Sequence, residues 1–155
     1  MIYPSLNERL KNQHTAISAI ILNLVEERLN DHPEPGKWSI HDNIAHLAKY
    51  QPLFIGRIHS ILTFDNPAFE RYNADEDPEF KSWQAQPLSW LLSRIDTDRQ
   101  LLFELITGLP DDKLERKGLH RKFGDLTVLK WAEFFLLHEA HHLYTIFQLA
   151  NGVVG

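Results

Sequence analysis

The chain has 155 residues, of which 43% are hydrophobic and 24% are charged, and we expect one globular domain over residues 1–155. The formal net charge is -5 and the 16 Lys and Arg residues are scattered, which argues against nucleic acid as a partner because phosphate binding needs clustered basic side chains. Cysteine is absent, which excludes disulfides and thiolate ligands, so any metal must be held by His, Asp or Glu.

The sequence also indicates where the protein resides. Its N-terminus has no basic stretch followed by an apolar core, and no apolar run approaches the ~20 residues of a membrane-spanning helix. We therefore expect a cytoplasmic protein with no membrane partner. No internal repeat, low-complexity tract or domain linker is visible.

The first predicted helix covers residues 6–29. Ser5 and Glu8 can form a capping box, in which each side chain satisfies a free backbone N–H at the helix start. Apolar residues then recur at the three-four spacing of one helical face. The helix should end before residues 32–36, which contain two prolines and a glycine.

The second predicted helix covers residues 40–62, after Ser39 as the N-cap and with Asp42 at the third helical position. One face is predicted to be buried, and its members are Ile40, Ile44, Leu47, Gln51, Phe54, Ile58 and Ile61. Pro52 interrupts this pattern and should kink the helix, at a cost of roughly 3 kcal/mol unless packing compensates.

A long connection follows, over residues 64–86. It carries six acidic and five aromatic side chains, together with prolines. Connections of this length are uncommon in compact domains and are often functional lids. A crossover strap pinned by its aromatic residues is the alternative, and the sequence leaves both open.

The third predicted helix runs from Pro87, which suits a first helical position, to a stop at Gly108. A polar loop leads to the fourth helix, over about residues 126–150, for which Asp125 or Thr127 can serve as the cap. No segment alternates like a strand for more than a few residues. Four long helices with one long crossover between the second and the third predict an all-α fold, a four-helix bundle.

Histidines provide the main functional signal. His138 and His142 are four residues apart, so they lie on one face of the fourth helix, where both replace apolar residues in the inward-facing row. Burying two imidazoles without partners is costly, and a shared metal ion is one solution. Two core histidines satisfied by hydrogen bonds are the alternative. His141 points about a third of a turn away, toward solvent or a layer behind the ligands.

A third ligand is predicted at His46, on the edge of the apolar stripe of the second helix, because bundle cores assemble metal sites from facing helices. Three histidines would leave a position of a zinc ion open for water or substrate. Asp42 lies one turn earlier and could orient the His46 imidazole. Simple helix capping is the other interpretation of Asp42.

Residues 138–142 also match H-E-x-x-H, the helix motif of zinc metalloproteases, in which the Glu is the general base. The extended form of the motif fails because residue 145 is threonine, and no acidic residue follows His142 to act as a third ligand. A protease is therefore disfavoured. Glu139 could still be the base for a metal-bound water, or it could lie on an exposed helix surface.

Two segments resemble a known family. Trp38-Ser39-Ile40 leading to His46-Leu47, and Gly124-Asp125-Leu126-Thr127 opening a helix that contains residues 138–142, are similar to the DinB/YfiT-like superfamily. The resemblance covers nearly the whole chain in element order. It implies a four-helix bundle, often a homodimer, that binds Zn, Ni or a similar divalent ion through His46, His138 and His142.

The resemblance also implies a range of activities. Characterised members include S-transferases and isomerases that use low-molecular-weight thiols, and others are described as metal-dependent hydrolases of small molecules. A histidine in the loop before the last helix lies near the pocket in some members, and His120 holds a comparable place, although it could also be an exposed loop residue. A non-catalytic metal or small-ligand binding module, and a structural bundle without metal, are the competing hypotheses.

Overall fold

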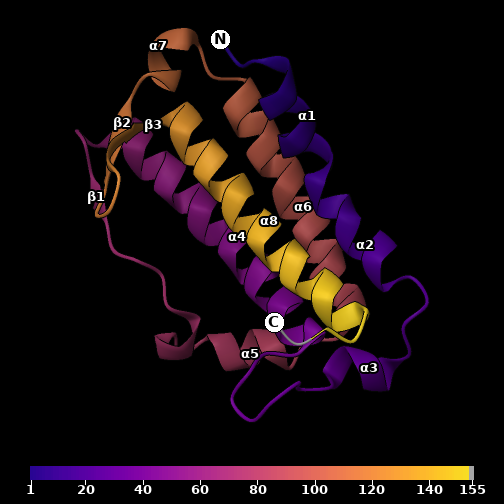
Figure 1. Cartoon of the computed structure of the whole chain (residues 1–155). Helices are drawn as coiled ribbons and strands as arrows, with labels where there is room; N and C mark the ends of the chain where they lie inside the picture. Colours follow the sequence, from indigo (N-terminus) through magenta and orange to yellow (C-terminus); the bar gives the residue numbers. More distant parts are fainter. Residues whose placement is uncertain (154–155) are drawn as a thin grey trace.

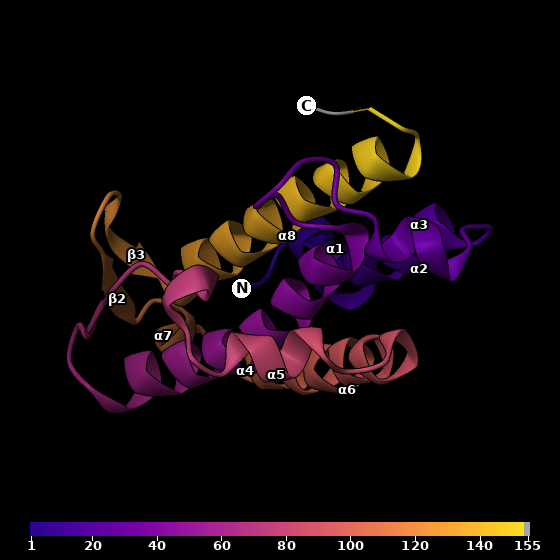
Figure 2. The same cartoon turned by 90° about the horizontal axis from the view of Figure 1, so that it is seen from below.

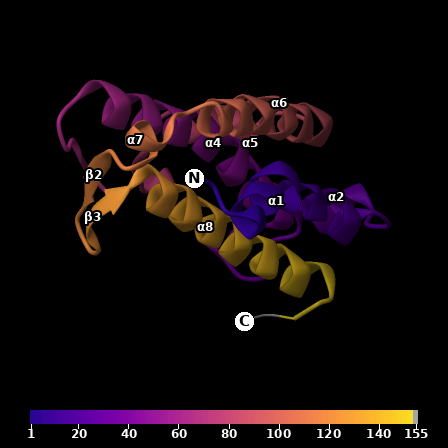
Figure 3. The same ribbon diagram turned by 90° about the horizontal axis from the view of Figure 1, so that it is seen from above.

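The computed structural model, described here for residues 1–153, is a bundle of four helical rods (Figure 1). The rods are α1 and α2 (Pro4–Asn12 and Ala16–Ile21, joined by the 3-10 turn η1, Gln13–Thr15), α4 (Ile40–Thr63), α6 (Leu88–Thr107) and α8 (Val128–Ala150). Seen from above, α4 and α6 form one side of the bundle, and α8 and α1–α2 form the other (Figure 3). Contacts of α4 with α8 and of α1 with α6 join the two sides. The predicted four-helix bundle is thereby confirmed.

The first rod differs from its prediction. Helix α1 begins at Pro4, after Tyr3 as an N-cap without a side-chain hydrogen bond, so the capping box expected from Ser5 and Glu8 is not formed. The rod tightens at η1 and ends at Ile21, and a separate short helix, α3 (Glu26–Asn30), follows. Hydrophobic periodicity could not show these breaks because the three-four spacing continues across them.

Helix α4 agrees closely with its prediction. Ser39 and Asp42 form the complete capping box, and Pro52 lies inside the helix. All seven residues of the predicted inward face are buried: Ile40, Ile44, Leu47, Gln51, Phe54, Ile58 and Ile61. The bounds of α6 and α8 also match within two residues, and the Thr127 side chain caps α8 by accepting from the Lys130 N–H.

The structure adds a small three-stranded sheet that the sequence analysis did not predict. The crossover contains β1 (Ala68–Phe69), η2 (Ala74–Glu76) and α5 (Phe80–Gln84), and the polar connection before α8 contains α7 (Asp111–Leu114), β2 (Lys117–His120) and β3 (Gly124–Thr127). Strand β1 pairs in parallel with β2, with Ala68 opposite Leu119, and β2 pairs antiparallel with β3. Strands of two to four residues are too short to show alternation, and β1 exists only through pairing with a distant segment.

The crossover runs along the outside of α4, and α5 lies against that helix (Figure 2). The sheet packs against the end of α4 that contains Ile61, and a glycine permits this packing. A Cβ on Gly118 would lie 2.8 Å from the side chain of Ile61 and 2.9 Å from that of Phe69. The Trp131 indole donates to the Gly118 carbonyl at 3.1 Å, which joins the sheet to α8. None of the helices in residues 1–153 has the length and apolarity that crossing a bilayer requires.

The apolar core is divided into two clusters, one toward the sheet and one toward α3 and α5. Polar side chains separate them at mid-height of the bundle. The buried members of this polar layer are His14, His46, Gln51, Arg99 and Glu139. Two further members, His138 and His142, are half-buried. Burying polar groups is costly unless they are paired, so this layer is where a functional site is to be sought.

Candidate metal centre

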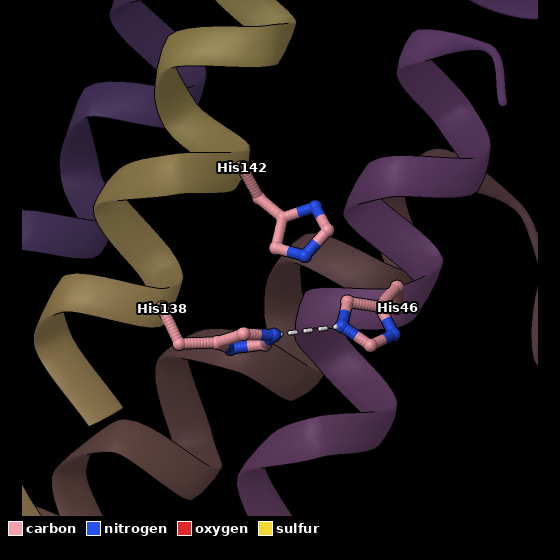
Figure 4. Close-up of side chains that lie close together, drawn as sticks. All are labelled: His46, His138 and His142. Atoms are coloured by element: carbon pink, nitrogen blue, oxygen red, sulfur yellow. Dashed lines mark hydrogen bonds between the residues drawn. The ribbon is translucent and has the colours of Figure 1, made fainter. Parts of the chain in front are cut away.

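Three histidines from two helices converge in the polar layer. His46 extends from α4 toward α8, and His138 and His142 extend from successive turns of α8 toward α4 (Figure 4). The Nε2 atoms of His46 and His138 are 3.1 Å apart. One ring nitrogen from each of the three residues lies within 4.8 Å of those from the other two.

The orientation of His142 is set by Asn43, one turn before His46 on α4. The Asn43 amide nitrogen donates to the Ser39 carbonyl at 2.8 Å, which leaves its Oδ1 to accept from the His142 Nδ1–H at 2.9 Å. The proton of the neutral ring is therefore on Nδ1, and the lone pair on Nε2 is available to a ligand. Sequence reasoning missed Asn43, although its place on the inward side of α4 was a usable signal.

The other two imidazoles lack such partners. The Nδ1 atoms of His46 and His138 are buried and have no hydrogen-bond partner among residues 1–153. Without an ion, the two facing Nε2 atoms share one hydrogen bond, in which only one of them carries the proton. The Nδ1 atom of each ring stays unpaired. Buried polar atoms without partners are uncommon, and they mark this cluster as incomplete.

Aromatic rings enclose the histidines. Trp38 packs on His46 with ring centres 5.1 Å apart, and the Tyr50 ring lies 4.3 Å from that of His138. From the crossover, Tyr72 stacks on His46 at 5.7 Å, and Phe80 meets its edge at 6.3 Å. The crossover therefore forms one wall of the site.

All three histidines are neutral at pH 7. Burial lowers the pKa of His46 to about 2, that of His138 to about 3 and that of His142 to about 4. Neighbouring imidazoles contribute to these lowered pKa values, because a proton on one ring disfavours a proton on the next. Neutral imidazole is the form that binds a metal ion.

The donor set fits a divalent ion of the zinc or nickel type. Imidazole nitrogens suit both metals, and two nitrogens on a tetrahedral zinc lie roughly 3.3 Å apart, close to the separation of the facing Nε2 atoms. An ion bound there would replace this Nε2–Nε2 hydrogen bond, and each of the two rings would then carry its proton on Nδ1. His46, His138 and His142 are the residues that would hold it.

Asp42 does not orient His46, which corrects that expectation. Its Oδ2 accepts from the Ser39 N–H at 2.9 Å, its Oδ1 accepts from the Gln84 amide at 3.0 Å, and His46 Nδ1 has no partner. The capping interpretation of Asp42 is the correct one. His141 is exposed, with its ring centre 5.4 Å from that of His142, and no hydrogen bond joins the two rings in the described part of the chain.

Glu139 was expected either at the metal or on an exposed surface, and it is in neither place. It is 1% exposed and forms an ion pair with Arg99, which is also 1% exposed, while the Gln13 amide donates to it at 3.0 Å. The H-E-x-x-H match is therefore a coincidence of spacing, because its glutamate faces α6 and η1. A carboxylate held by a buried guanidinium is not positioned to serve as a base at the histidines.

His120 lies at the end of β2, half-buried, and is not a member of the three-histidine cluster. A surface hollow of about 390 Å³, lined by residues of the α2–α3 turn and the end of α8, also contains none of the three ligands.

Comparisons with known proteins agree with this geometry. A protein of Oceanobacillus iheyensis named "Putative metal-dependent hydrolase" is 26% identical over 131 residues, covering 84% of this chain and 76% of its own length. The uncharacterized protein YuaE of Bacillus subtilis is 26% identical over 132 residues, covering 77% of this chain and 82% of its own.

Among solved structures, YfiT from Bacillus subtilis, described as "a probable metal-dependent hydrolase with an unusual four-helix bundle topology", has the same fold. It aligns with a TM-score of 0.79 and 18% identity over 97% of this chain and 87% of its own. The family model described as the DinB superfamily matches residues 9–146. The chain therefore belongs to the DinB superfamily.

Proposed function

We propose that the protein binds one divalent metal ion, zinc or nickel, through His46, His138 and His142, and acts as a metal-dependent hydrolase of a small molecule. The observation that carries the proposal is that the Nε2 atoms of the neutral His46 and His138 rings face each other, 3.1 Å apart. The Nδ1 atoms of the same two rings are buried and have no partner among the described residues. The names of the Oceanobacillus iheyensis relative and of YfiT support the same class of activity.

The residues of the chain have distinct parts in this function. Asn43 keeps the Nε2 lone pair of His142 directed into the site, and Trp38, Tyr50 and Tyr72 exclude bulk water from the ligands. An ion with three imidazole ligands supplies Lewis acidity and can activate water, or a thiol brought by the substrate, near neutral pH. Because the chain has no cysteine, thiol transfer would depend on an external low-molecular-weight thiol.

A second candidate is a binding module without turnover. It is favoured by the placement of the carboxylates, since both candidates from the sequence, Asp42 and Glu139, are engaged elsewhere. If the ion acts alone on its bound water, no carboxylate is needed, and the hydrolase hypothesis stands.

Elemental analysis of protein purified without a His-tag tests both. We expect about one divalent ion per chain, loss of the ion in His138→Ala and His142→Ala, and full retention in the control His59→Ala, because His59 is exposed on α4. Turnover of small esters and amides that disappears with a chelator and returns with metal supports the hydrolase. Bound metal without turnover of any such substrate favours the module, and unchanged metal content in both alanine variants overturns the site.

A further inference from the structure

Arg57 lies on the face of α4 that carries the metal ligand. It follows His46 by eleven residues, which is close to three helical turns, and Tyr50 lies between them on the same side. Its guanidinium carbon is 6.0 Å from the centre of the Tyr50 ring, and the Tyr50 ring centre is 4.3 Å from that of His138. The guanidinium carbon of Arg57 therefore lies no farther from the centre of the His138 ring than these two distances added together.

The charge of Arg57 has no counter-ion within the described residues. Its Nη2 donates to the Glu70 carbonyl at 2.7 Å and its Nη1 to the Tyr50 hydroxyl at 3.3 Å. No carboxylate of residues 1–153 forms an ion pair with it, whereas Arg9, Arg94, Arg99 and Arg121 each have one.

The half-buried Arg116 also forms no ion pair with residues 1–153, but Arg57 is the one that packs on the Tyr50 ring. Phe69 and Trp131 place ring centres 5.5 Å and 5.9 Å from the guanidinium carbon of Arg57, so water has limited access to the charge. Burial of a charge is costly unless it is paired. A guanidinium has five N–H donors, and Arg57 forms two hydrogen bonds with the described residues, which leaves donors for an anionic ligand.

His120 provides a second donor on the same side. Its Nδ1 accepts from the backbone N–H groups of Lys122 and Phe123, at 3.1 Å and 3.2 Å, so the ring proton is on Nε2. Its ring centre lies 5.4 Å from that of Trp131, against which Arg57 also packs. Burial and the charge of Arg57 lower the pKa of His120, which keeps the ring a neutral donor at pH 7.

We propose that Arg57, assisted by His120, binds a carboxylate group of the substrate whose reacting group is held at the three histidines. One fixed positive charge beside one neutral donor matches a monoanion, and the planar guanidinium fork matches the two oxygens of a carboxylate. Of the other cations nearby, Arg121 is paired with Glu70 and Lys122 lies over the Phe123 ring, so Arg57 supplies the fixed charge of the subsite.

This inference names the substrate class of the proposed hydrolase and so rests on that function, but its binding test does not need the metal. Benzoate and the neutral benzamide are titrated into chelator-treated protein and followed by calorimetry or chemical shifts. Wild type should bind benzoate about 10- to 100-fold more tightly than benzamide, because hydrogen bonds to charged groups are lost with the amide.

Variants then locate the subsite. Arg57→Gln should remove the preference for benzoate over benzamide, and Arg57→Lys should keep part of it by retaining the charge without the fork. The control Arg71→Gln, on the exposed surface of the crossover, should leave it unchanged. The quantity compared is the ratio of the affinities for benzoate and benzamide. If loss of the Glu70 contact only loosens the crossover, both affinities fall and this ratio stays the same.

Two outcomes overturn the subsite: wild type that binds benzoate no better than benzamide, and a preference that survives in Arg57→Gln. Metal loading is measured separately in the same samples. A protein that binds no metal but shows the Arg57-dependent preference contradicts the hydrolase while the carboxylate subsite stands. A metalloprotein without the preference contradicts the subsite alone.

Discussion

Two polar clusters share the layer at mid-height of the bundle, and they differ in how their groups are paired. In the Arg99 network, formed by Arg99, Glu139, Gln13, His14 and Gln51, the guanidinium contacts the Glu139 carboxylate, the Gln51 amide oxygen, the Leu10 carbonyl and the His14 ring. In the three-histidine cluster, two ring nitrogens have no partner and two others face each other.

This difference separates structure from function. The Arg99 network joins α1–α2, α4, α6 and α8, and its groups find their partners inside the chain, so it is complete without a ligand. The three-histidine cluster holds two facing Nε2 atoms and two buried Nδ1 atoms that no group of residues 1–153 pairs, so its groups are not satisfied from within. Buried polar groups that satisfy one another indicate a framework, and those that do not indicate a binding site.

Acid should have the largest effect, and it acts on both clusters. Burial lowers the pKa of His46, His138 and His142 to about 2, 3 and 4, and burial together with the charge of Arg99 lowers that of His14 to about 4. In the unfolded chain each histidine returns to about 6.5. Between those values the unfolded state binds more protons, so stability is complete above about pH 6.5 and falls as the pH drops below it.

Each histidine contributes about 1.4 kcal/mol per pH unit in that window. Urea denaturation of metal-free protein should therefore show a free energy of unfolding several kcal/mol lower at pH 5 than at pH 7. His138→Gln and His14→Gln should each reduce this pH dependence by one proton, which assigns the effect to one cluster or the other. Equal stability at pH 5 and pH 7 would falsify the neutral state of both clusters.

Breaking the Arg99 network should have the next largest effect. Glu139→Gln leaves the buried Arg99 without its counter-charge and should cost about 3–5 kcal/mol of unfolding free energy. Glu133→Gln is the matched control, one and a half turns earlier on α8, because the pair of Glu133 with Arg9 is partly exposed and should cost under about 1 kcal/mol.

The double variant Arg99→Met, Glu139→Leu removes both charges and should be less destabilised than Glu139→Gln. If Glu139→Gln proved as mild as the Glu133 control, the network would not be the framework described above. Metal content of these variants, measured on the folded fraction, should stay at the wild-type level, because neither residue belongs to the three-histidine cluster.

The smallest expected effect concerns Asn43. Asn43→Ala removes the acceptor of the His142 Nδ1–H and should weaken the binding of zinc about 10- to 100-fold, as loss of a hydrogen-bond partner of a ligand histidine commonly does. Competition with a chelating dye measures it. Asp42→Asn is the control, since Asp42 caps α4 and does not contact a ligand ring, and equal losses in both variants would argue that helix stability alone is responsible.

The sequence predicted the helices well where the signal was local. The cap at Ser39 and the inward row of α4 follow from residue type and spacing, and of the two caps considered for α8, Asp125 and Thr127, the structure has Thr127. The i, i+4 spacing of His138 and His142 places two candidate ligand rings on one face. The failures are non-local. Strand β1 depends on a partner about fifty residues away, and no periodicity in its own sequence reports that pairing.

The errors in the site have the same origin. Asp42 and Asn43 are adjacent in α4. Gln84 of the crossover contacts Asp42, whereas His142 of α8 contacts Asn43, so the residue that orients a histidine is decided by segments distant in sequence. Glu139 was expected at the metal or on the surface because its partner was overlooked. A signal did exist: Arg99 falls within the inward row of α6, between Ile95 and Leu102, where a charge needs a buried counter-charge.

The parallel pairing of β1 with β2 has a consequence for the order of folding. Its hydrogen bond from the Leu119 N–H to the Pro67 carbonyl, 2.9 Å long, closes a loop that contains the whole of α6. Contacts between segments so distant in sequence pay a large closure entropy and form late, and a two-residue strand gains little in return. The crossover should therefore dock after the helices have assembled, and it should be among the first segments to open in hydrogen exchange. The wall of the site that contains Tyr72 and Phe80 then forms late in folding and opens early.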